Sequence, residues 1–166
     1  MLITNKALSI KEMKQLIQLL GFNNFDVGLY SKLNFNNNNN KMILIQSDIN
    51  PLFGHWCMYY NNIFYDPSGN KPLELWKKYN LDNNKQNKDK LFNYFKKFNE
   101  LDYNDFDYQK LLNSQTCGHH CLVRYYYKDL NNDQFKKFLF NIKKKYNYNN
   151  FDDLIVDVLN VILKNY

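Results

Sequence analysis

The stretch GHWCMYYNNIFYDPSG, residues 54–69, decides the fold because it has the pattern of one β-hairpin. Two runs of strand-forming residues, 55–60 and 63–66, are separated only by Asn61 and Asn62. Asparagine tolerates the positive φ that a two-residue hairpin turn requires. The sequence therefore predicts two adjacent antiparallel strands with these two asparagines at the turn.

The register of this hairpin brings a histidine to a carboxylate. Cys57 lies opposite Asp66, and His55, two residues before Cys57, shares the face of Asp66. Such diagonal neighbours are about 7–8 Å apart at the backbone and within reach of each other's side chains. A slip of one residue would put them on opposite faces of the sheet. The alternative is a surface histidine and an aspartate that starts a turn, since Asp-Pro is a common turn signal.

A second stretch, NSQTCGHHC at residues 113–121, supplies a thiol. Cys117 stands at the expected start of a helix, where backbone amides and the positive end of the helix dipole favour a thiolate. A cysteine with a distant histidine is the raw material of a nucleophilic active site, and a carboxylate can fix the tautomer of the histidine. Gly118 is expected to leave room for a substrate. The alternative for Cys117 is a small buried core residue.

The cluster of cysteines and histidines in 117–121 also raises the possibility of zinc. Cys117 and Cys121 would share one face of the helix, but one helical turn cannot surround a metal tetrahedrally, and the remote ligand pair of a zinc finger is absent from the sequence. We therefore expect no metal and no cofactor. His119 and His120 are expected to line the site or to pack in the core.

Composition limits the class of protein. The 166 residues match one domain, residues 1–166, and a hydrophobic share of 45 % is enough for a core. No stretch approaches the roughly 20 apolar residues that span a bilayer, and the first residues lack the features of a signal peptide, so we expect an intracellular chain with no membrane contact. Three cysteines, an odd number, argue against a disulfide framework.

The net charge of +6 has two interpretations. It can be a solvated basic surface, or it can attract DNA weakly and in a salt-dependent way. The lysines are spread along the chain rather than gathered in a known nucleic-acid motif.

Apolar periodicity predicts the other elements. Ser9 and Glu12 form a capping box for a helix that ends at Gly21. Further helices are expected from Pro72, at 117–127 and in two C-terminal segments. Further strands are expected at 42–45 and 105–112. The segment 22–33 is expected to be irregular and the asparagine run at 36–40 to be a loop. Helices at both ends with strands between them predict an α+β fold.

Three motifs in order resemble the adenovirus-type cysteine proteases. These are GHW at 54–56, YDPSG at 65–69 and NSQTCGHHC at 113–121, and the resemblance covers roughly residues 3–127. It is strongest to the maturation proteases of virophages and Polinton-type elements, which belong to one clan with the ubiquitin-like-protein proteases. The resemblance implies the fold of that clan, a small mixed central sheet flanked by helices.

The resemblance also implies the role of each site residue. His55 would be the general base, Asp66 the acid that orients it, and Cys117 the nucleophile. Gln109 would donate to the oxyanion, although it stands one residue further upstream than the adenovirus spacing, where this chain has Lys110. The residues expected to contact substrate or flank the site are Gly54, Trp56 and Gly118.

By the same resemblance, the chain would cleave peptide bonds through a thioester acyl-enzyme. Its substrates would be viral capsid or core precursor polypeptides, cut after Gly-Gly-like sequences in the virus factory of the host cytoplasm and in the virion. Two alternatives stay open. One is a deubiquitinating or deSUMOylating protease of the same clan, and the other is a non-enzymatic basic module that binds nucleic acid or a capsid.

Overall fold

The hairpin expected from residues 54–69 is present in the computed structural model. It consists of β3 (Gly54–Tyr60) and β4 (Ile63–Tyr65), which pair antiparallel with Tyr60 opposite Ile63. The predicted register is thereby confirmed. The structure describes residues 3–46, 54–78, 93–94, 96, 102–109 and 114–166.

The turn of the hairpin explains why the register is fixed. Asn61 and Asn62 have φ values of 43° and 62°, and two positive values in succession are what a two-residue type I′ turn requires. Continued by one pair beyond the ladder, the register sets Cys57 opposite Asp66. The loop after β4 therefore begins with the aspartate that the sequence analysis singled out.

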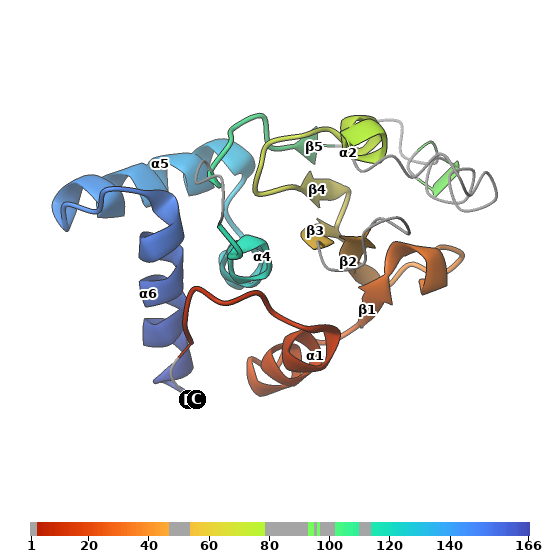
Figure 1. The fold of residues 1–166 in the computed structure, drawn as a ribbon, viewed down its shortest axis with the longest axis horizontal. Helices are drawn as coiled ribbons and strands as arrows, with labels where there is room; N and C mark the ends of the chain where they lie inside the picture. Colours follow the sequence, from red (N-terminus) through yellow and green to blue (C-terminus); the bar gives the residue numbers. More distant parts are fainter. Residues whose placement is uncertain (1–2, 47–53, 79–92, 95, 97–101, 110–113) are drawn as a thin grey trace.

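Five strands form one mixed sheet in the order β1-β2-β3-β4-β5 (Figure 1). β1 (Phe25–Leu29) pairs parallel with β2 (Asn40–Gln46), and the short β5 (Asp102–Tyr103) pairs parallel with β4. The central pairs, β2 with β3 and β3 with β4, are antiparallel. This small mixed sheet with helices around it confirms the α+β class.

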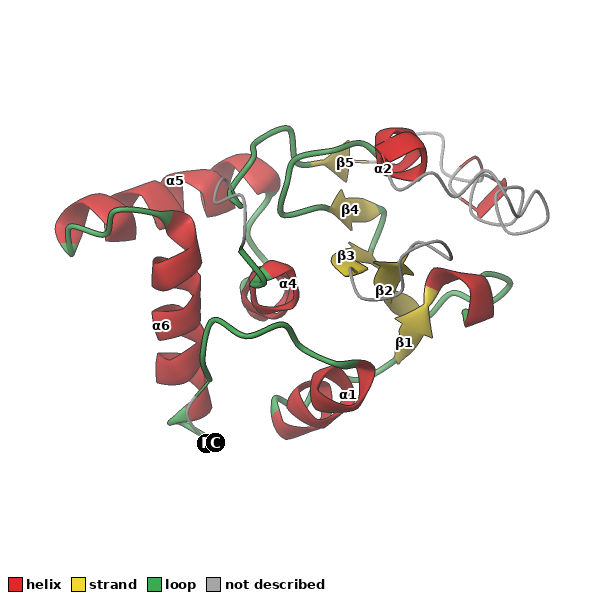
Figure 2. Ribbon diagram, viewed as in Figure 1, coloured by secondary structure: helices red, strands yellow, loops and turns green. Residues whose placement is uncertain are grey.

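The two faces of the sheet carry two separate cores. Four helices gather on one face, and α2 (Pro72–Lys78) lies on the other side (Figure 2). Side chains of successive residues in a strand point to opposite faces. Those facing the four helices include Met42, Trp56, Met58, Tyr60 and Tyr65, and those in the smaller core with Leu75 of α2 include Ile43, Ile45, Cys57, Tyr59 and Phe64.

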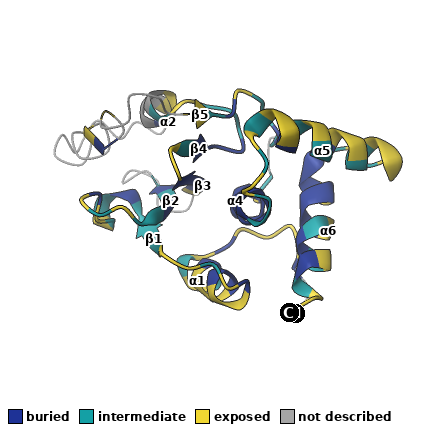
Figure 3. Ribbon diagram, turned by 180° about the vertical axis from the view of Figure 1, so that it is seen from behind, coloured by how far each residue is buried: buried dark blue, intermediate teal, exposed yellow. Residues whose placement is uncertain are grey.

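The helix α4 (Cys117–Tyr126) lies at the centre of the larger core. It packs against β3 on one side and against α6 (Phe151–Leu163) on the other, with α1 (Ile10–Leu19) and α5 (Asn132–Lys145) beside it (Figure 3). Every residue of α4 except the last is buried, as expected for a helix that is surrounded by protein. The cysteine that opens this helix is thus held by the most buried element of the molecule.

A buried arginine secures the other end of α4. The guanidinium of Arg124, fully buried, donates to the carbonyl oxygens of Tyr127 at 3.1 Å and Leu130 at 2.9 Å, and it lies over the rings of Tyr60 and Phe135. A cation at a helix C-terminus interacts favourably with the helix dipole and with carbonyl groups that lack a partner in the helix. Arg124 therefore fixes where α4 stops and the chain turns toward α5.

The asparagine run is a loop over 36–39, as expected, while Asn40 already begins β2, and the loop surrounds a buried ion pair. The ammonium group of Lys41, which is fully buried, lies 3.1 Å from the carboxylate of Asp26. Asn37 accepts from Lys41 at 2.5 Å through its side-chain oxygen and donates to Asp26 at 3.0 Å through its amide. Asn39 donates a second amide bond to Asp26 at 3.0 Å. These amides satisfy both charges, without which burial of the pair would be costly.

Two expectations about strands were wrong. The segment 22–33 contains β1, which was missed because Asp26 and Gly28 weaken its strand character and its pairing with β2 is not local. The strand expected at 105–112 is absent over its described part, 105–109, which is irregular. There the backbone amides of Tyr108 and Gln109 both donate to the carbonyl oxygen of Pro67, at 2.8 and 3.2 Å, so they bind a loop instead of a neighbouring strand.

Gly69 ends the turn that follows β4, and its conformation can be tested. Its φ is +70°, and a Cβ there would lie 2.9 Å from the carbonyl carbon of Phe106 and 3.0 Å from the amide nitrogen of Asp107. Gly21 has a similar φ of +66° but open space around it, with no heavy atom within 4 Å of a Cβ.

We expect Gly69→Ala to lower the free energy of unfolding by about 3 kcal/mol and Gly21→Ala by about 1 kcal/mol, because the first adds a clash with backbone to the strain that both share. Urea denaturation of the two variants measures the difference. Equal losses would show that the loop at Phe106 moves freely away from the turn.

Candidate active site

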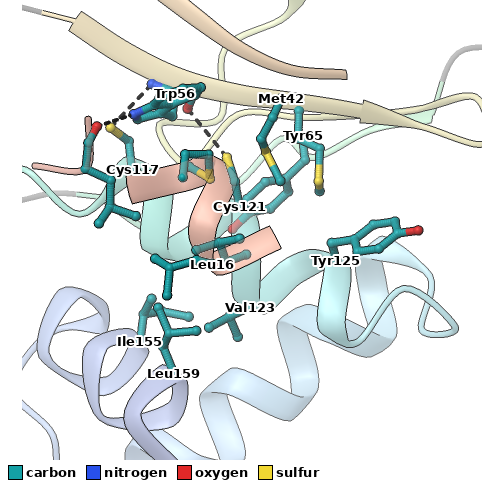
Figure 4. Packing of buried hydrophobic residues seen from close by; sticks show 14 of the residues in the cluster. Leu16, Met42, Trp56, Tyr65, Cys117, Cys121, Val123, Tyr125, Ile155 and Leu159 are labelled. Carbon is teal, nitrogen blue, oxygen red and sulfur yellow. Dashed lines mark hydrogen bonds between the residues drawn. The ribbon is translucent and has the colours of Figure 1, made fainter. Parts of the chain in front are cut away.

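The candidate site lies where β3 and β4 part. Their ladder covers only residues 58–60 of β3, so the first half of β3 is paired with β2 alone. There the backbone N–H of Trp56 donates to the sulfur of Cys117 at 3.3 Å, and the thiol of Cys121 donates to the carbonyl oxygen of Trp56 at 3.6 Å (Figure 4). The N–H and C=O of a strand residue point to the same side. The first turn of α4 therefore occupies the place that a longer β4 would take.

His55 and Asp66 meet at this junction. The Nε2 atom of His55 hydrogen-bonds to Oδ1 of Asp66, and both residues are buried, with 5 % and 0 % of their surface exposed. The sulfur of Cys117 accepts from the backbone N–H of Trp56, the residue next to His55, and Cys117 is close enough to His55 to raise the pKa of its imidazole. The structure thus brings together the three residues that the sequence placed in a catalytic triad.

Asp66 is held ionised by a shell of hydrogen bonds. The backbone N–H of Ser68 donates to Oδ1 at 3.1 Å, and Asn70 donates to Oδ2 through its backbone at 2.8 Å and its side chain at 2.6 Å. Burial raises the pKa of Asp66, but the charge of His55 and these hydrogen bonds outweigh it and hold the pKa below its ordinary value. Asp66 is therefore a negative charge in a dry site.

Two asparagines in this shell were missed by the sequence analysis. Asn70 follows the turn directly, and asparagines that bond back to a nearby aspartate are common in turns, so its position was a usable signal. Asn104 accepts from the backbone N–H of Asp66 at 2.9 Å and donates to its carbonyl oxygen at 2.6 Å. No local pattern signals Asn104, which lies 38 residues further along the chain.

His55 is a cation at neutral pH. Burial lowers the pKa of its imidazole, but Asp66 and Cys117 more than compensate and raise the pKa to about 10. A positively charged ring beside Cys117 is placed to stabilise negative charge that develops on the sulfur during a reaction.

Cys117 also stands at an uncapped helix end. Thr116 is the N-cap of α4, yet its side chain makes no capping bond with any described amide. The first amides of a helix have no partner within the helix, so the N–H groups around Cys117 are available to a negative charge. With 6 % of its surface exposed, the cysteine is close to the surface but not open to bulk solvent.

The side chain of Gln109 contacts Ser114 in this structure. Its amide nitrogen donates to the carbonyl oxygen of Ser114 at 3.1 Å and to the hydroxyl at 3.2 Å, so both N–H groups are used. Gln109 therefore tethers the segment before the nucleophile, and its role as an oxyanion donor stays a prediction. Lys110 lies outside the described residues, and the exposed Gln115 accepts from the backbone of Ala7 at 3.2 Å.

Of the three residues expected to contact substrate or flank the site, only Gly54 is exposed. Trp56 is 2 % exposed, and its indole N–H donates to the carbonyl oxygen of Leu8 at 2.8 Å. Gly118 is buried, and a Cβ there would lie 2.9 Å from Cε of Met13 and 3.1 Å from the Trp56 ring. Both residues hold α4 against its neighbours, and their contact with a substrate stays a prediction.

The remaining histidines belong to the core. His119 and His120 are fully buried, and burial lowers the pKa of His119 to about 4 and that of His120 below its ordinary value. Both are therefore neutral at physiological pH. Among the residues that the structure describes, no three His, Cys, Asp or Glu side chains are placed to hold a metal ion.

Comparison with known proteins adds no family: the chain matches no protein-family model, no curated protein and no solved structure. In the described part of the chain, no helix has the length and apolar character needed to cross a membrane. The interpretation of the site therefore depends on its own geometry.

The charge of His55 leads to a pH prediction. Its pKa in the folded protein, about 10, exceeds the ordinary 6.5, so its stabilising contribution is complete below pH 6.5 and disappears as the pH rises through 10. We expect Asp66→Asn to destabilise the protein most near pH 6, and the difference from wild type to shrink toward pH 10. Urea denaturation at several pH values measures this.

Proton NMR tests the same charge directly, because the chain has only three histidines. We expect the His55 ring signal to titrate near pH 10 in the wild type and below pH 6.5 in Asp66→Asn, while His119 stays near 4 in both proteins. A His55 signal that titrates near 6.5 in both would contradict the buried ion pair.

Proposed function

We propose that this chain is a cysteine endopeptidase. The observation that carries the proposal is the meeting of Cys117, His55 and Asp66 at one buried junction, where the imidazole bonds to the carboxylate and the sulfur bonds to the backbone of the residue next to His55. Three residues from a strand, a turn and a helix, separated by up to 62 positions in the sequence (117 − 55), have no structural need to converge in this chemical order. A nucleophile, a base and a group that orients the base are the parts of covalent acyl transfer.

The geometry supports the following mechanism. The thiolate of Cys117 attacks the carbonyl carbon of the scissile peptide, and the electron pair of the C=O bond moves to the oxygen. The backbone N–H at the start of α4 is placed to stabilise this oxyanion. The imidazolium of His55 then gives its proton to the departing amine, and a thioester with Cys117 remains. A water molecule then gives a proton to His55 while its oxygen adds to the thioester carbon. The C–S bond breaks, the carboxylic acid leaves, and the thiolate of Cys117 is restored beside the imidazolium.

The burial of the site supports a narrow substrate preference. Cys117 and His55 expose only 6 % and 5 % of their surfaces, so a peptide chain with small side chains reaches them more easily than one with large side chains. This favours cleavage next to Gly-Gly-like sequences. The sequence resemblance favours capsid and core precursor polypeptides of a virophage or Polinton-type element as substrates, and the adenovirus-type protease fold as the architecture, with action in the virus factory and the virion.

Two other functions are separable by experiment. A deubiquitinating or deSUMOylating enzyme would use the same three residues on a folded substrate that ends in Gly-Gly. In a basic module that binds nucleic acid or a capsid, Cys117 would have no catalytic function. DNA at low salt is a useful additive in the assay, because the net charge of +6 allows a weak, salt-dependent effect.

Cys117→Ala is expected to reduce the cleavage of a Gly-Gly-containing peptide by about a thousandfold or more, because the nucleophile is lost. In the wild type, iodoacetamide should label Cys117 far faster than the other cysteines, since burial raises the pKa of Cys57 and of Cys121 well above the usual value of a thiol. Cleavage is followed with a fluorogenic peptide and labelling with mass spectrometry of the folded protein.

Cys57→Ser is the matched control, because the buried Cys57 thiol donates to the carbonyl oxygen of Ile43 at 3.8 Å and a serine hydroxyl can donate there as well, so cleavage and labelling should stay within about twofold. A ubiquitin–fluorophore conjugate in the same assay distinguishes the deubiquitinase. Equal labelling of all three cysteines, together with no cleavage of any peptide in the panel, would falsify the proposal.

A further inference from the structure

A second buried carboxylate lies behind the candidate site. Asp152 stands in the first turn of α6 and is 2 % exposed. Its Oδ1 atom accepts from the hydroxyl of Thr116, from the hydroxyl of Ser114 at 2.5 Å, and lies 3.4 Å from Nε2 of His120. Ser114 and Thr116 are the residues that lead into Cys117. The proposed mechanism makes no use of Asp152.

Thr116 differs from the N-caps of α1, α5 and α6. Ser9, Asn131 and Asn150 have extended backbones, with ψ of 165°, 172° and 171°, and each accepts a capping bond from an amide of its helix. Thr116 has ψ of 7° and makes no such bond, although threonine is a good capping residue. Its hydroxyl is directed to Asp152 instead.

The difference has a consequence for Cys117. A capping side chain would occupy an amide of the first turn of α4 and draw the Thr116 backbone into the extended conformation. That would move the residue next to the nucleophile and reduce the positive potential at the sulfur. Because Asp152 holds the hydroxyl, the amides of the first turn stay directed at the site.

We propose that Asp152 is a positioning residue for the nucleophile. Its carboxylate accepts a hydrogen bond from the Thr116 hydroxyl and so holds Thr116 in its non-capping conformation. The inference rests on the proposed function, since it assigns a reason for the uncapped helix end at Cys117. Burial raises the pKa of Asp152, and the bonds from His120, Ser114 and Thr116 outweigh it and hold the pKa below its ordinary value, so the acceptor is ionised. His120 is buried and neutral and adds no competing charge.

The rate of iodoacetamide alkylation of Cys117 at pH 6 tests this without any peptide substrate. Asp152→Ala frees the Thr116 hydroxyl to cap α4 and to occupy an amide of its first turn, so the rate should fall about fivefold to tenfold. Asp152→Asn keeps an oxygen that accepts from Thr116 and Ser114, so its rate should stay within about twofold of the wild type.

The double variant Asp152→Ala/Thr116→Val separates positioning from general damage. Valine has no hydroxyl to cap the helix, so the alkylation rate should return to within about twofold of the wild type, although stability is lost further. A double variant as slow as Asp152→Ala, or an Asp152→Ala variant as fast as the wild type, would overturn the inference. Circular dichroism checks the fold, and Asp152→Ser replaces Asp152→Ala if the latter does not fold.

The outcomes for Asp152 and for the proposed function are distinguishable. A wild type in which Cys117 is no more reactive than Cys57 contradicts the protease itself. If Cys117 is reactive but its alkylation rate is the same in every Asp152 variant, only the positioning role is contradicted.

Discussion

The contact between the first turn of α4 and the half of β3 that extends beyond β4 is the constraint on which the rest of the site depends. Because β4 is short, the backbone N–H and C=O of Trp56 have no strand partner on that side, and the two cysteines one helical turn apart supply the acceptor and the donor. A buried backbone group without a partner would be costly, so the sheet and the helix fix each other's position. The same contact sets the sulfur of Cys117 beside His55, the residue before Trp56 in the sequence. The contact that holds the helix to the sheet and the candidate site are therefore at the same place in the fold.

Asparagine has a common role at the buried charges of this protein. Asn70 donates to the carboxylate of Asp66, and Asn37 and Asn39 donate to the carboxylate of Asp26, which pairs with Lys41. A side-chain amide forms hydrogen bonds to a buried ion without adding a charge of its own. It therefore lowers the free-energy cost of burying the ion and does not compete with the oppositely charged partner. In the candidate site, that partner is the imidazolium of His55. Asparagine is abundant in this chain in a way that fits codon bias, but at these positions its side chains stabilise buried charges.

The local elements were predictable where chemistry and periodicity agree. The turn at Asn61 and Asn62 fixed the hairpin register, and with it the approach of His55 to Asp66; the capping box of Ser9 and the apolar stripes of the terminal helices were read correctly as well. The edge strand β1 was missed, because a half-buried strand that contains Gly28 and pairs in parallel leaves a weak local signal. The irregular course of residues 105–109 was missed because their amides bond to Pro67, about 40 residues away in the sequence.

The sequence by itself determined the local parts of the candidate site: a hairpin that sets an imidazole beside a carboxylate, and a thiol at the start of a helix. These follow from turn geometry and strand periodicity, which act over a few residues. Only the tertiary structure decided that the helix enters the gap between β3 and β4, that Gly118 packs against Met13 and Trp56, and that Asp152 holds the hydroxyl of Thr116. Such contacts join segments 36 to 105 residues apart (152 − 116 and 118 − 13), and shape and burial in the folded core select them without leaving a local pattern.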